Sequence, residues 1–174
     1  METKMCGKAW VFGDFLDVDH EICNAAEVRA LKEKATPITK ESLAPFCMTV
    51  VDPEFPDKAG KGDILVAGEN MGYGHDHYEG CLSILGCGIA AVLCDSAAAY
   101  FFRNALENGL PVVECPGIRS ATEQGDDMEI DLEAGSIKNL TQNTDFRFIP
   151  YSGVLLNFVR QGGLYEALRQ EKKE

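Results

Sequence analysis

The sequence predicts an α/β domain in which parallel central strands are followed by an antiparallel appendix. The first observation is a set of three short strand patterns, at residues 62–67, 89–94 and 111–115, of which the first two contain continuous apolar runs typical of strands buried on both faces. The second is the helical composition of the segments between them, at 78–85 and 97–107. The third is that the strand patterns after residue 127 follow one another across short turns. The alternation of strand and helix indicates parallel pairing with right-handed crossovers.

The N-terminal part supplies one more strand and several less regular segments. Residues 8–13 are predicted to form a strand, and residues 14–20 an acidic loop. Residues 27–34 have helical composition, but Pro37 breaks any helix in the charged stretch 32–40, which we expect to be an exposed loop. The remaining segments before the central sheet are a single helical turn at 42–46 and a loop at 50–61.

The C-terminal third of the chain changes character. Apolar and acidic residues alternate over 128–132, and further strands are expected at 137–140 and 146–150, which together form an antiparallel meander. A helical region at 153–169 closes the chain and is interrupted by two adjacent glycines, at 162 and 163. This meander is the appendix that follows the parallel strands.

Composition limits the possible functions. The chain has 174 residues, which suits a single domain over 1–174, and its 28 acidic and 16 basic residues give a formal net charge of −12. The acidic balance argues against binding to nucleic acid or to an anionic membrane, and no apolar run reaches the roughly 20 residues that span a bilayer. Residues 1–8 lack the apolar core of a signal peptide. Seven cysteines without Cys-x-x-Cys spacing predict buried, reduced thiols in a cytoplasmic protein and no metal site.

The loop at residues 68–80 holds the densest set of side chains capable of chemistry. Its centre reads Gly-Tyr-Gly-His-Asp-His-Tyr-Glu over residues 72–79. It follows a predicted strand and precedes a helix, where α/β proteins bind ligands, and its glycines allow a backbone to approach a ligand closely. Neither a dinucleotide fingerprint nor a Walker motif is present. The loop therefore offers binding and catalytic candidates: Gly72, Gly74, His75, Asp76 and His77.

A second acidic segment, residues 13–20, contains Asp17, Asp19 and His20. Carboxylates beside an imidazole suggest an acid–base arrangement, although acidic loops are more often only solvated. All three histidines of the chain lie in these two loops, and imidazole suits both proton transfer near neutral pH and metal ligation. If the two loops converge, the three imidazoles share one site.

Motifs along most of the chain carry a resemblance to a known family. They are Val11-Phe12-Gly13-Asp14, Asp52-Pro53-Glu54-Phe55, Gly62-Asp63-Ile64-Leu65-Val66-Ala67-Gly68, Phe102-Arg103-Asn104-Ala105, Asn108-Gly109-Leu110-Pro111-Val112, Cys115-Pro116-Gly117 and Ile137-Lys138-Asn139. In these motifs the sequence resembles the small subunits of 3-isopropylmalate dehydratase, which are equivalent to the swivel domain of aconitase. The resemblance implies a β/β/α swivelling domain over the whole chain.

The resemblance also implies a partner and a reaction. Small subunits of this family pair with a larger subunit that holds a [4Fe–4S] cluster through its own cysteines, which fits the cysteine spacing here. The family dehydrates and rehydrates 2-hydroxy di- or tricarboxylates, with the cluster as Lewis acid on the leaving hydroxyl and a swivel-domain serine as base. We therefore expect this chain to be stable but inactive alone. Residues 23–40 correspond to the substrate-selecting segment, which we expect to be a flexible loop.

The sequence departs from the family at the loop that carries the base. The family loop reads Gly-Cys-Gly-Ser-Ser-Arg-Glu-His, whereas here His75, Asp76 and His77 stand at the positions of the base serine, the second serine and the substrate-binding arginine. An imidazole with its ordinary pKa of about 6.5 is already a base. His75 is therefore expected to replace the serine, oriented by Asp76 or Asp19. A protonated His77 would be a weaker substitute for the bidentate arginine.

Other positions keep or replace features of the family. Asp19-His20 matches the Thr-Asp-His pattern of aconitases, so both residues are catalytic candidates. Arg29 is the only arginine within 23–40 and the best substitute for an anion clamp. Arg103 stands at a family position and is a second substrate-binding candidate. Together with its neighbour Asn104 it could instead brace a loop.

Three hypotheses follow from these residues. The first is the small subunit of an aconitase-type hydro-lyase with an altered base, acting with its large subunit on a 2-hydroxy dicarboxylate, either 3-isopropylmalate or a related malate derivative. The altered loop favours a substrate that differs from that of a plain isopropylmalate isomerase. The second is a non-catalytic partner that closes the cleft of the large subunit. The third is an enzyme that binds a metal directly through His20, His75 and His77, with Glu79 as an optional fourth ligand.

Overall fold

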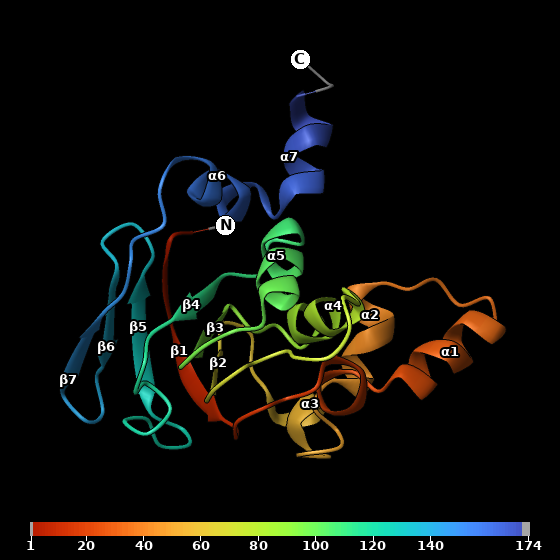
Figure 1. Cartoon of the computed structure of the whole chain (residues 1–174), viewed down its shortest axis with the longest axis horizontal. Helices are drawn as coiled ribbons and strands as arrows, with labels where there is room; N and C mark the ends of the chain where they lie inside the picture. Colours follow the sequence, from red (N-terminus) through yellow and green to blue (C-terminus); the bar gives the residue numbers. More distant parts are fainter. Residues whose placement is uncertain (1, 172–174) are drawn as a thin grey trace.

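The computed structural model describes residues 2–171 and contains a seven-stranded sheet in the order β4-β3-β2-β1-β5-β6-β7. The central strand β1 (Lys4–Val11) pairs in parallel with β2 (Ile64–Ala67) and antiparallel with β5 (Asp127–Asp131). The outer strands continue both patterns: β3 (Ala91–Cys94) and β4 (Val112–Glu114) are parallel, and β6 (Ser136–Asn139) and β7 (Thr144–Arg147) are antiparallel. Figure 1 shows β1 between the two parts. The predicted α/β fold, with a parallel centre and an antiparallel appendix, is confirmed.

The side chains of β2 alternate between two apolar cores. Leu65 and Ala67 point into one core, and Ile64 and Val66 into the other. All four residues are fully buried, as expected for a continuously apolar strand that is covered on both faces. The helices that complete the two cores are α3 (Phe55–Lys58), α4 (Glu79–Gly86) and α5 (Ala99–Glu107) for the first and α6 (Gly153–Gln161) for the second.

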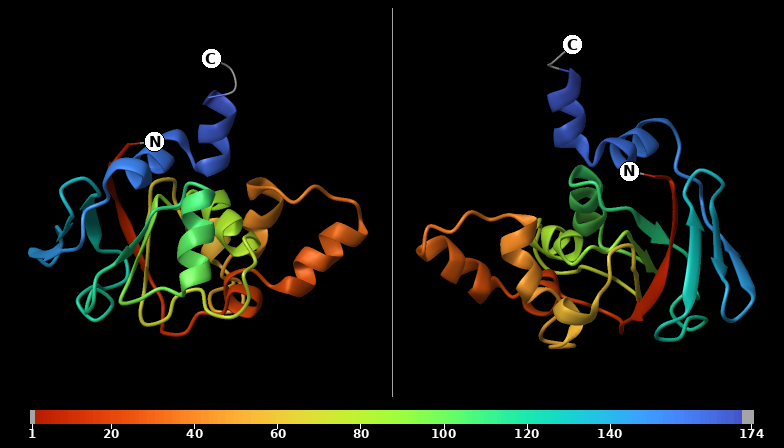
Figure 2. Two further views of the ribbon diagram at one scale, coloured as in Figure 1. Left: turned by 45° about the horizontal axis from the view of Figure 1, so that its top comes forward. Right: turned by 180° about the vertical axis from the view of Figure 1, so that it is seen from behind.

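The remaining helical elements lie around this body. The helix α1 (Ala25–Glu33) projects at the end of the molecule opposite β6 and β7 in the views of Figures 1 and 2. It is followed by α2 (Lys40–Leu43) and a 3-10 turn, η2 (Ala44–Phe46), which both pack against α4. At the other end, α6 stops at Gly162, whose φ of 83° provides a left-handed cap, and α7 (Leu164–Glu171) follows. The predicted interruption at the two glycines is confirmed.

Some local predictions were wrong for identifiable reasons. The acidic segment 14–20 is not only a loop, because a π-helical turn, η1 (Val18–Ile22), begins within it. The predicted loop 50–61 contains α3, where Pro56 occupies a first-turn position that tolerates a missing amide hydrogen. The strand expected at 146–150 is β7, which lies two to three residues earlier. Within 23–40, the structure places the regular helix α1, whose first turn is capped by the side chain of Asn24.

Within residues 2–171, the structure has no helix that is both long enough and apolar enough to cross a membrane.

Candidate active site

Backbone pairing brings the two polar loops together. The amide of Gly72 donates to the carbonyl of Leu16 at 2.9 Å, and the amide of Val18 donates to the carbonyl of Tyr73 at 2.9 Å. Asp17 and Tyr73 form an isolated parallel bridge between these hydrogen bonds. The convergence that the sequence left open is therefore real, and it places η1 directly beside residues 72–77.

Asp17 holds η1 in place as its N-terminal cap. Its Oδ1 atom accepts hydrogen bonds from the amides of Asp19 at 2.8 Å and His20 at 3.1 Å. Burial opposes ionisation of Asp17, but these hydrogen bonds outweigh it and hold the pKa of the carboxyl below its usual value. A charged cap at the first turn of a helix satisfies amides that have no partner within the helix. Asp17 thereby fixes the position of Asp19.

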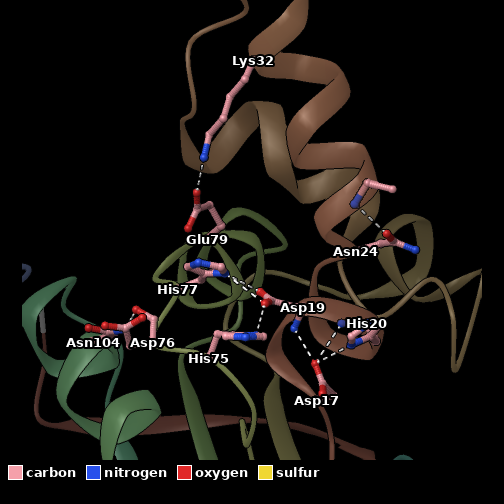
Figure 3. A network of polar contacts seen from close by, with 11 residues as sticks. Asp17, Asp19, His20, Asn24, Lys32, His75, Asp76, His77, Glu79 and Asn104 are labelled. Carbon is pink, nitrogen blue, oxygen red and sulfur yellow. Dashed lines mark hydrogen bonds and ion pairs between the residues drawn. The ribbon is translucent and has the colours of Figure 1, made fainter.

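Two imidazoles share the carboxylate of Asp19 (Figure 3). The Nδ1 atom of His75 lies 2.8 Å from Oδ2, and the Nδ1 atom of His77 lies 2.8 Å from Oδ1 and 3.0 Å from Oδ2. The two rings stack at a centroid distance of 5.5 Å with an interplanar angle of 21°. Only 8% of the Asp19 side chain is exposed, compared with 71% for His75 and 53% for His77. A buried anion therefore anchors two solvent-facing rings.

This anchoring fixes which ring atoms can act on a substrate. Because each Nδ1 atom faces Asp19, Nε2 is the ring nitrogen left for an incoming molecule. The hydrogen bond with Asp19 raises the pKa of His77 above its ordinary value, despite an opposing contribution from partial burial. His77 is thus favoured as a cation. The site combines two oriented imidazoles, and Asp19 favours the protonated form of His77.

The structure does not bring all candidates into this cluster. The Nδ1 atom of His20 lies 3.0 Å from Oδ1 of Asp17, so the expectation that three imidazoles share one site was wrong. The expected alternative in which Asp76 orients His75 was also wrong, because Asp19 makes that contact. The backbone carbonyl of Asp76 accepts a hydrogen bond from Nδ2 of Asn104 at 2.8 Å, and Figure 3 shows this pair away from the imidazoles. Loop bracing, one of the two roles considered for Asn104, is the one observed.

The two glycines of the loop serve its conformation. Gly72 has a φ of 74°, and a Cβ atom there would lie 2.1 Å from the ring of Phe101. Gly74 has a φ of 105°, and a Cβ atom there would lie 3.1 Å from Oδ2 of Asp17. Both positions favour glycine through backbone angle and packing. Their predicted contact with a substrate stays a prediction.

A pocket of about 210 Å³ opens beside the imidazole pair. Its polar lining comes from η1, α1 and the start of α4, namely Asp19, Arg29, Lys32, His77 and Glu79. The Nζ atom of Lys32 lies 2.9 Å from Oε1 of Glu79, and only 9% of the Glu79 side chain is exposed. This ion pair connects α1 to the first residue of α4. Arg29, the predicted anion clamp, therefore lies at the same pocket as His77.

Arg103 has contacts of a different kind. Its guanidinium lies 5.3 Å from the centre of the Tyr100 ring, and its Nε atom lies 3.9 Å from Oε1 of Glu107. Both partners belong to the same helix, α5, and 60% of the Arg103 side chain is exposed. Its role as a substrate-binding residue stays a prediction.

Comparisons with known proteins identify the family. No family model matches the chain. The chain is 36% identical to 3-isopropylmalate dehydratase small subunit 1 of Methanopyrus kandleri, over 98% of this chain and 96% of the relative. It is also 36% identical to the isopropylmalate/citramalate isomerase small subunit of Methanocaldococcus jannaschii, over 100% of this chain and 99% of the relative. The chain belongs to the family of 3-isopropylmalate dehydratase small subunits. The crystal structure of a 3-isopropylmalate dehydratase from M. jannaschii matches this fold with a TM-score of 0.86 and 32% identity, covering 98% of this chain and 96% of that one.

Membership in this family of small subunits implies a large-subunit partner and a place in a hydro-lyase or isomerase complex. The family resemblance predicted from the sequence motifs is therefore confirmed. Two of the three departures in the loop, His75 and His77, contact Asp19, so they alter the part of the fold where the polar loops meet.

The cysteines of this family member do not form a ligand set for a cluster. Five of the seven are buried, as predicted, but Cys6 is exposed and Cys87 is half-buried. Burial raises the pKa of the Cys81 and Cys94 thiols well above their usual value, which disfavours the thiolate that a metal requires. Among residues 2–171, no group of three or more His, Cys, Asp or Glu residues is arranged to hold a metal ion. In the part of the chain that the structure describes, the side chains therefore do not fit an iron–sulfur cluster or the three-histidine metal site.

Sequence reasoning missed the ion pair between Lys32 and Glu79. The two residues are separated by 47 positions, and no local spacing marks the contact. Glu79 was considered only as a metal ligand, and Lys32 only as part of a charged loop. The one available signal in the sequence is that Glu79 stands in the first turn of a predicted helix, 78–85, whose following residues are mostly apolar.

Proposed function

We propose that this chain is the small subunit of a hydro-lyase that removes water from, and returns it to, a malate-type 2-hydroxy dicarboxylate. The anchoring of two imidazoles by one buried carboxylate carries the proposal, because it leaves both Nε2 atoms for substrate. The names of the relatives support the substrate class, since they refer to isopropylmalate and citramalate. Both compounds are substituted malates.

His75 acts as the base in this proposal. In dehydration, its Nε2 atom accepts the proton from the carbon next to a carboxylate. The electrons of that C–H bond form the double bond, and the hydroxyl leaves the neighbouring carbon with its bonding pair. Asp19 positions the imidazole and stabilises the imidazolium that forms. A [4Fe–4S] cluster held by the large subunit would supply Lewis acidity to the leaving hydroxyl.

The other polar groups bind the substrate. A protonated His77 donates from Nε2 to one substrate carboxylate, which fits its raised pKa. Arg29, at the same pocket, contacts the second carboxylate or a polar substituent. The pocket also has apolar walls from Ala25 and Val28, which suit a small alkyl substituent.

The test is reconstitution with the aconitase-type large subunit encoded nearest to this chain, prepared without oxygen. Hydration of maleate, methylmaleate and isopropylmaleate is followed by the loss of absorbance of their double bonds. We expect hydration of at least one compound only when both subunits are present. Equal hydration by the large subunit alone would contradict a catalytic role and favour the cleft-closing alternative.

A further inference from the structure

A cluster of thiols lies behind the imidazole site, where η1, η2 and α4 meet. Cys23 and Cys47 are partners in an isolated antiparallel bridge, and the amide of Met48 donates to the carbonyl of Ile22 at 2.8 Å. This pattern is that of a non-hydrogen-bonded pair, in which side chains are closest. The fully buried hydroxyl of Ser83 on α4 donates to the carbonyl of Gly80 at 2.8 Å and also interacts with both thiols. Three chain segments therefore converge on one small group of sulfur atoms.

Cys87 brings a third thiol to this group. Cys87 caps the C-terminal end of α4, and Cys47 caps η2. The Sγ atom of Cys87 lies 3.4 Å from the carbonyl oxygen of Ala44, the first residue of η2. The amide of Cys47 donates to the same oxygen at 3.1 Å, so both cysteines lie against one carbonyl group, and their thiols interact. A covalent bond between them would join two elements that already pack together.

The two thiols differ in access and in ease of ionisation. Cys47 is fully buried, whereas Cys87 is half-buried. The hydrogen bond from Cys47 lowers the pKa of the Cys87 thiol despite its partial burial, whereas burial raises the pKa of the Cys47 thiol well above its usual value. A pocket of about 470 Å³ is lined by the adjacent Gly88, by Lys40 and Lys61, and by the exposed Cys6. Of the Cys47 and Cys87 thiols, the half-buried Cys87 is the one with solvent access.

We propose that Cys87 and Cys47 are a redox modification site that forms a reversible disulfide under mild oxidation by a peroxide. The Cys87 thiolate attacks one oxygen of hydrogen peroxide, the O–O bond breaks, and hydroxide leaves, which gives a sulfenic acid. The Cys47 sulfur then attacks the Cys87 sulfur, the S–OH bond breaks, and water leaves with the proton of Cys47. Overall the two sulfurs lose two electrons, and the peroxide is reduced to two waters.

Cys47 is favoured over Cys23 as the partner. Burial raises the pKa of both thiols, that of Cys23 to about 12, so ease of ionisation does not distinguish them. Cys47 is distinguished by its position, because its amide donates to the carbonyl oxygen of Ala44 at 3.1 Å and the Sγ atom of Cys87 lies 3.4 Å from the same oxygen. The disulfide would tie η2 to the end of α4, whose other end begins at Glu79 in the candidate active site.

The test uses the full-length chain alone, treated with a small excess of hydrogen peroxide, digested under thiol-blocking conditions and analysed by tandem mass spectrometry. We expect a mass loss of two hydrogen atoms, a cross-link between Cys47 and Cys87, and full reversal by dithiothreitol. Cys87→Ser should abolish the cross-link, and Cys6→Ser, at the exposed cysteine, should retain it. With Cys47→Ser, a sulfenic acid should accumulate at Cys87 and react with dimedone.

Three results would overturn the proposal. They are a cross-link between Cys23 and Cys47, oxidation confined to Cys6, and an unchanged mass. The dimedone experiment adds a readout that does not depend on disulfide formation. Dimedone labelling of Cys47→Ser at any cysteine other than Cys87 would also contradict the order of the two steps.

Discussion

His75 and His77 are held by the two oxygens of one carboxylate, since their Nδ1 atoms lie 2.8 Å from Oδ2 and from Oδ1 of Asp19, respectively. Asp19 is itself fixed by the cap that Asp17 provides for η1. A single buried anion thus sets the orientation of two imidazoles.

Asp19→Asn should impair catalysis without a comparable loss of substrate binding. An amide has no negative charge and replaces one of the two carboxylate oxygens with an NH₂ donor, so it cannot hold the two imidazoles as Asp19 does or stabilise an imidazolium. We expect kcat of the reconstituted complex to fall about 100-fold, with KM changed far less, because misplacement of a base by about 1 Å has such effects. Asp126→Asn, which weakens the 2.7 Å hydrogen bond from Asn139, is the control for a general loss of stability. An equal fall in kcat for both variants would contradict the positioning role.

The pair between His77 and Asp19 should make stability depend on pH. The pKa of His77 is raised in the folded state. The pair therefore stabilises the folded chain fully below the pKa of an unfolded histidine, about 6.5, and this stabilisation is lost as the pH rises through the pKa of His77 in the folded state. Because half of the side chain is exposed, solvent screens the pair, and we expect His77→Gln to cost about 0.5 kcal/mol at low pH. Urea unfolding of the chain at pH 5.5 and pH 8.5 should show that this cost disappears at the higher pH. An equal destabilisation by His77→Gln at both pH values would contradict a stabilising ion pair between His77 and Asp19.

Lys32→Ala should loosen α1 and destabilise the fold. It leaves the largely buried carboxylate of Glu79 without its partner, and we expect a loss of about 1 kcal/mol because the lysine itself is half exposed. Adding Glu79→Gln to this variant should recover part of the loss, since the uncompensated charge is then removed. Hydrogen exchange should increase in α1 of the single variant. Lys58→Ala, which breaks an exposed pair with Glu54, should cost less and leave exchange in α1 unchanged.

Gly72→Ala should be more damaging than an equivalent change elsewhere. A methyl group at residue 72 would meet the ring of Phe101 in addition to requiring a φ of 74°. Gly125 has a φ of 86° but open space around its Cβ position, so Gly125→Ala isolates the backbone effect. We expect losses in unfolding free energy of about 1 kcal/mol for Gly125→Ala and about 3 kcal/mol for Gly72→Ala. Equal losses, measured by chemical denaturation, would show that Phe101 yields to the methyl group.

The sequence allowed the fold to be predicted because its signals are local. The apolar run of β2 and the glycines after α6 mark a buried strand and a helix end by themselves. The turn η1 was missed because it depends on a cap from Asp17 and on pairing with Tyr73, which lies far along the chain. Its π-helical form has no simple periodic signature.

The candidate site was predictable in composition but not in geometry. The confinement of all histidines to two loops indicated that both loops matter. It did not reveal that His20 faces Asp17, whereas His75 and His77 face Asp19. Asp17 and Asp19 are only two residues apart, so a small change in backbone conformation could exchange the histidines that they contact. Only the folded loop determines which carboxylate contacts which histidine. The contact between Lys32 and Glu79 was hidden for the same reason.

The most direct measurement is the hydration rate of the reconstituted complex with His75→Ala. If His75 is the base, kcat should fall about 1,000-fold, as expected when a general base is removed, while association with the large subunit is unchanged. Lys138→Ala, on the distant strand β6, serves as the control and should keep the full rate. A rate for His75→Ala equal to that of the control would contradict the central claim and would place the base on the large subunit.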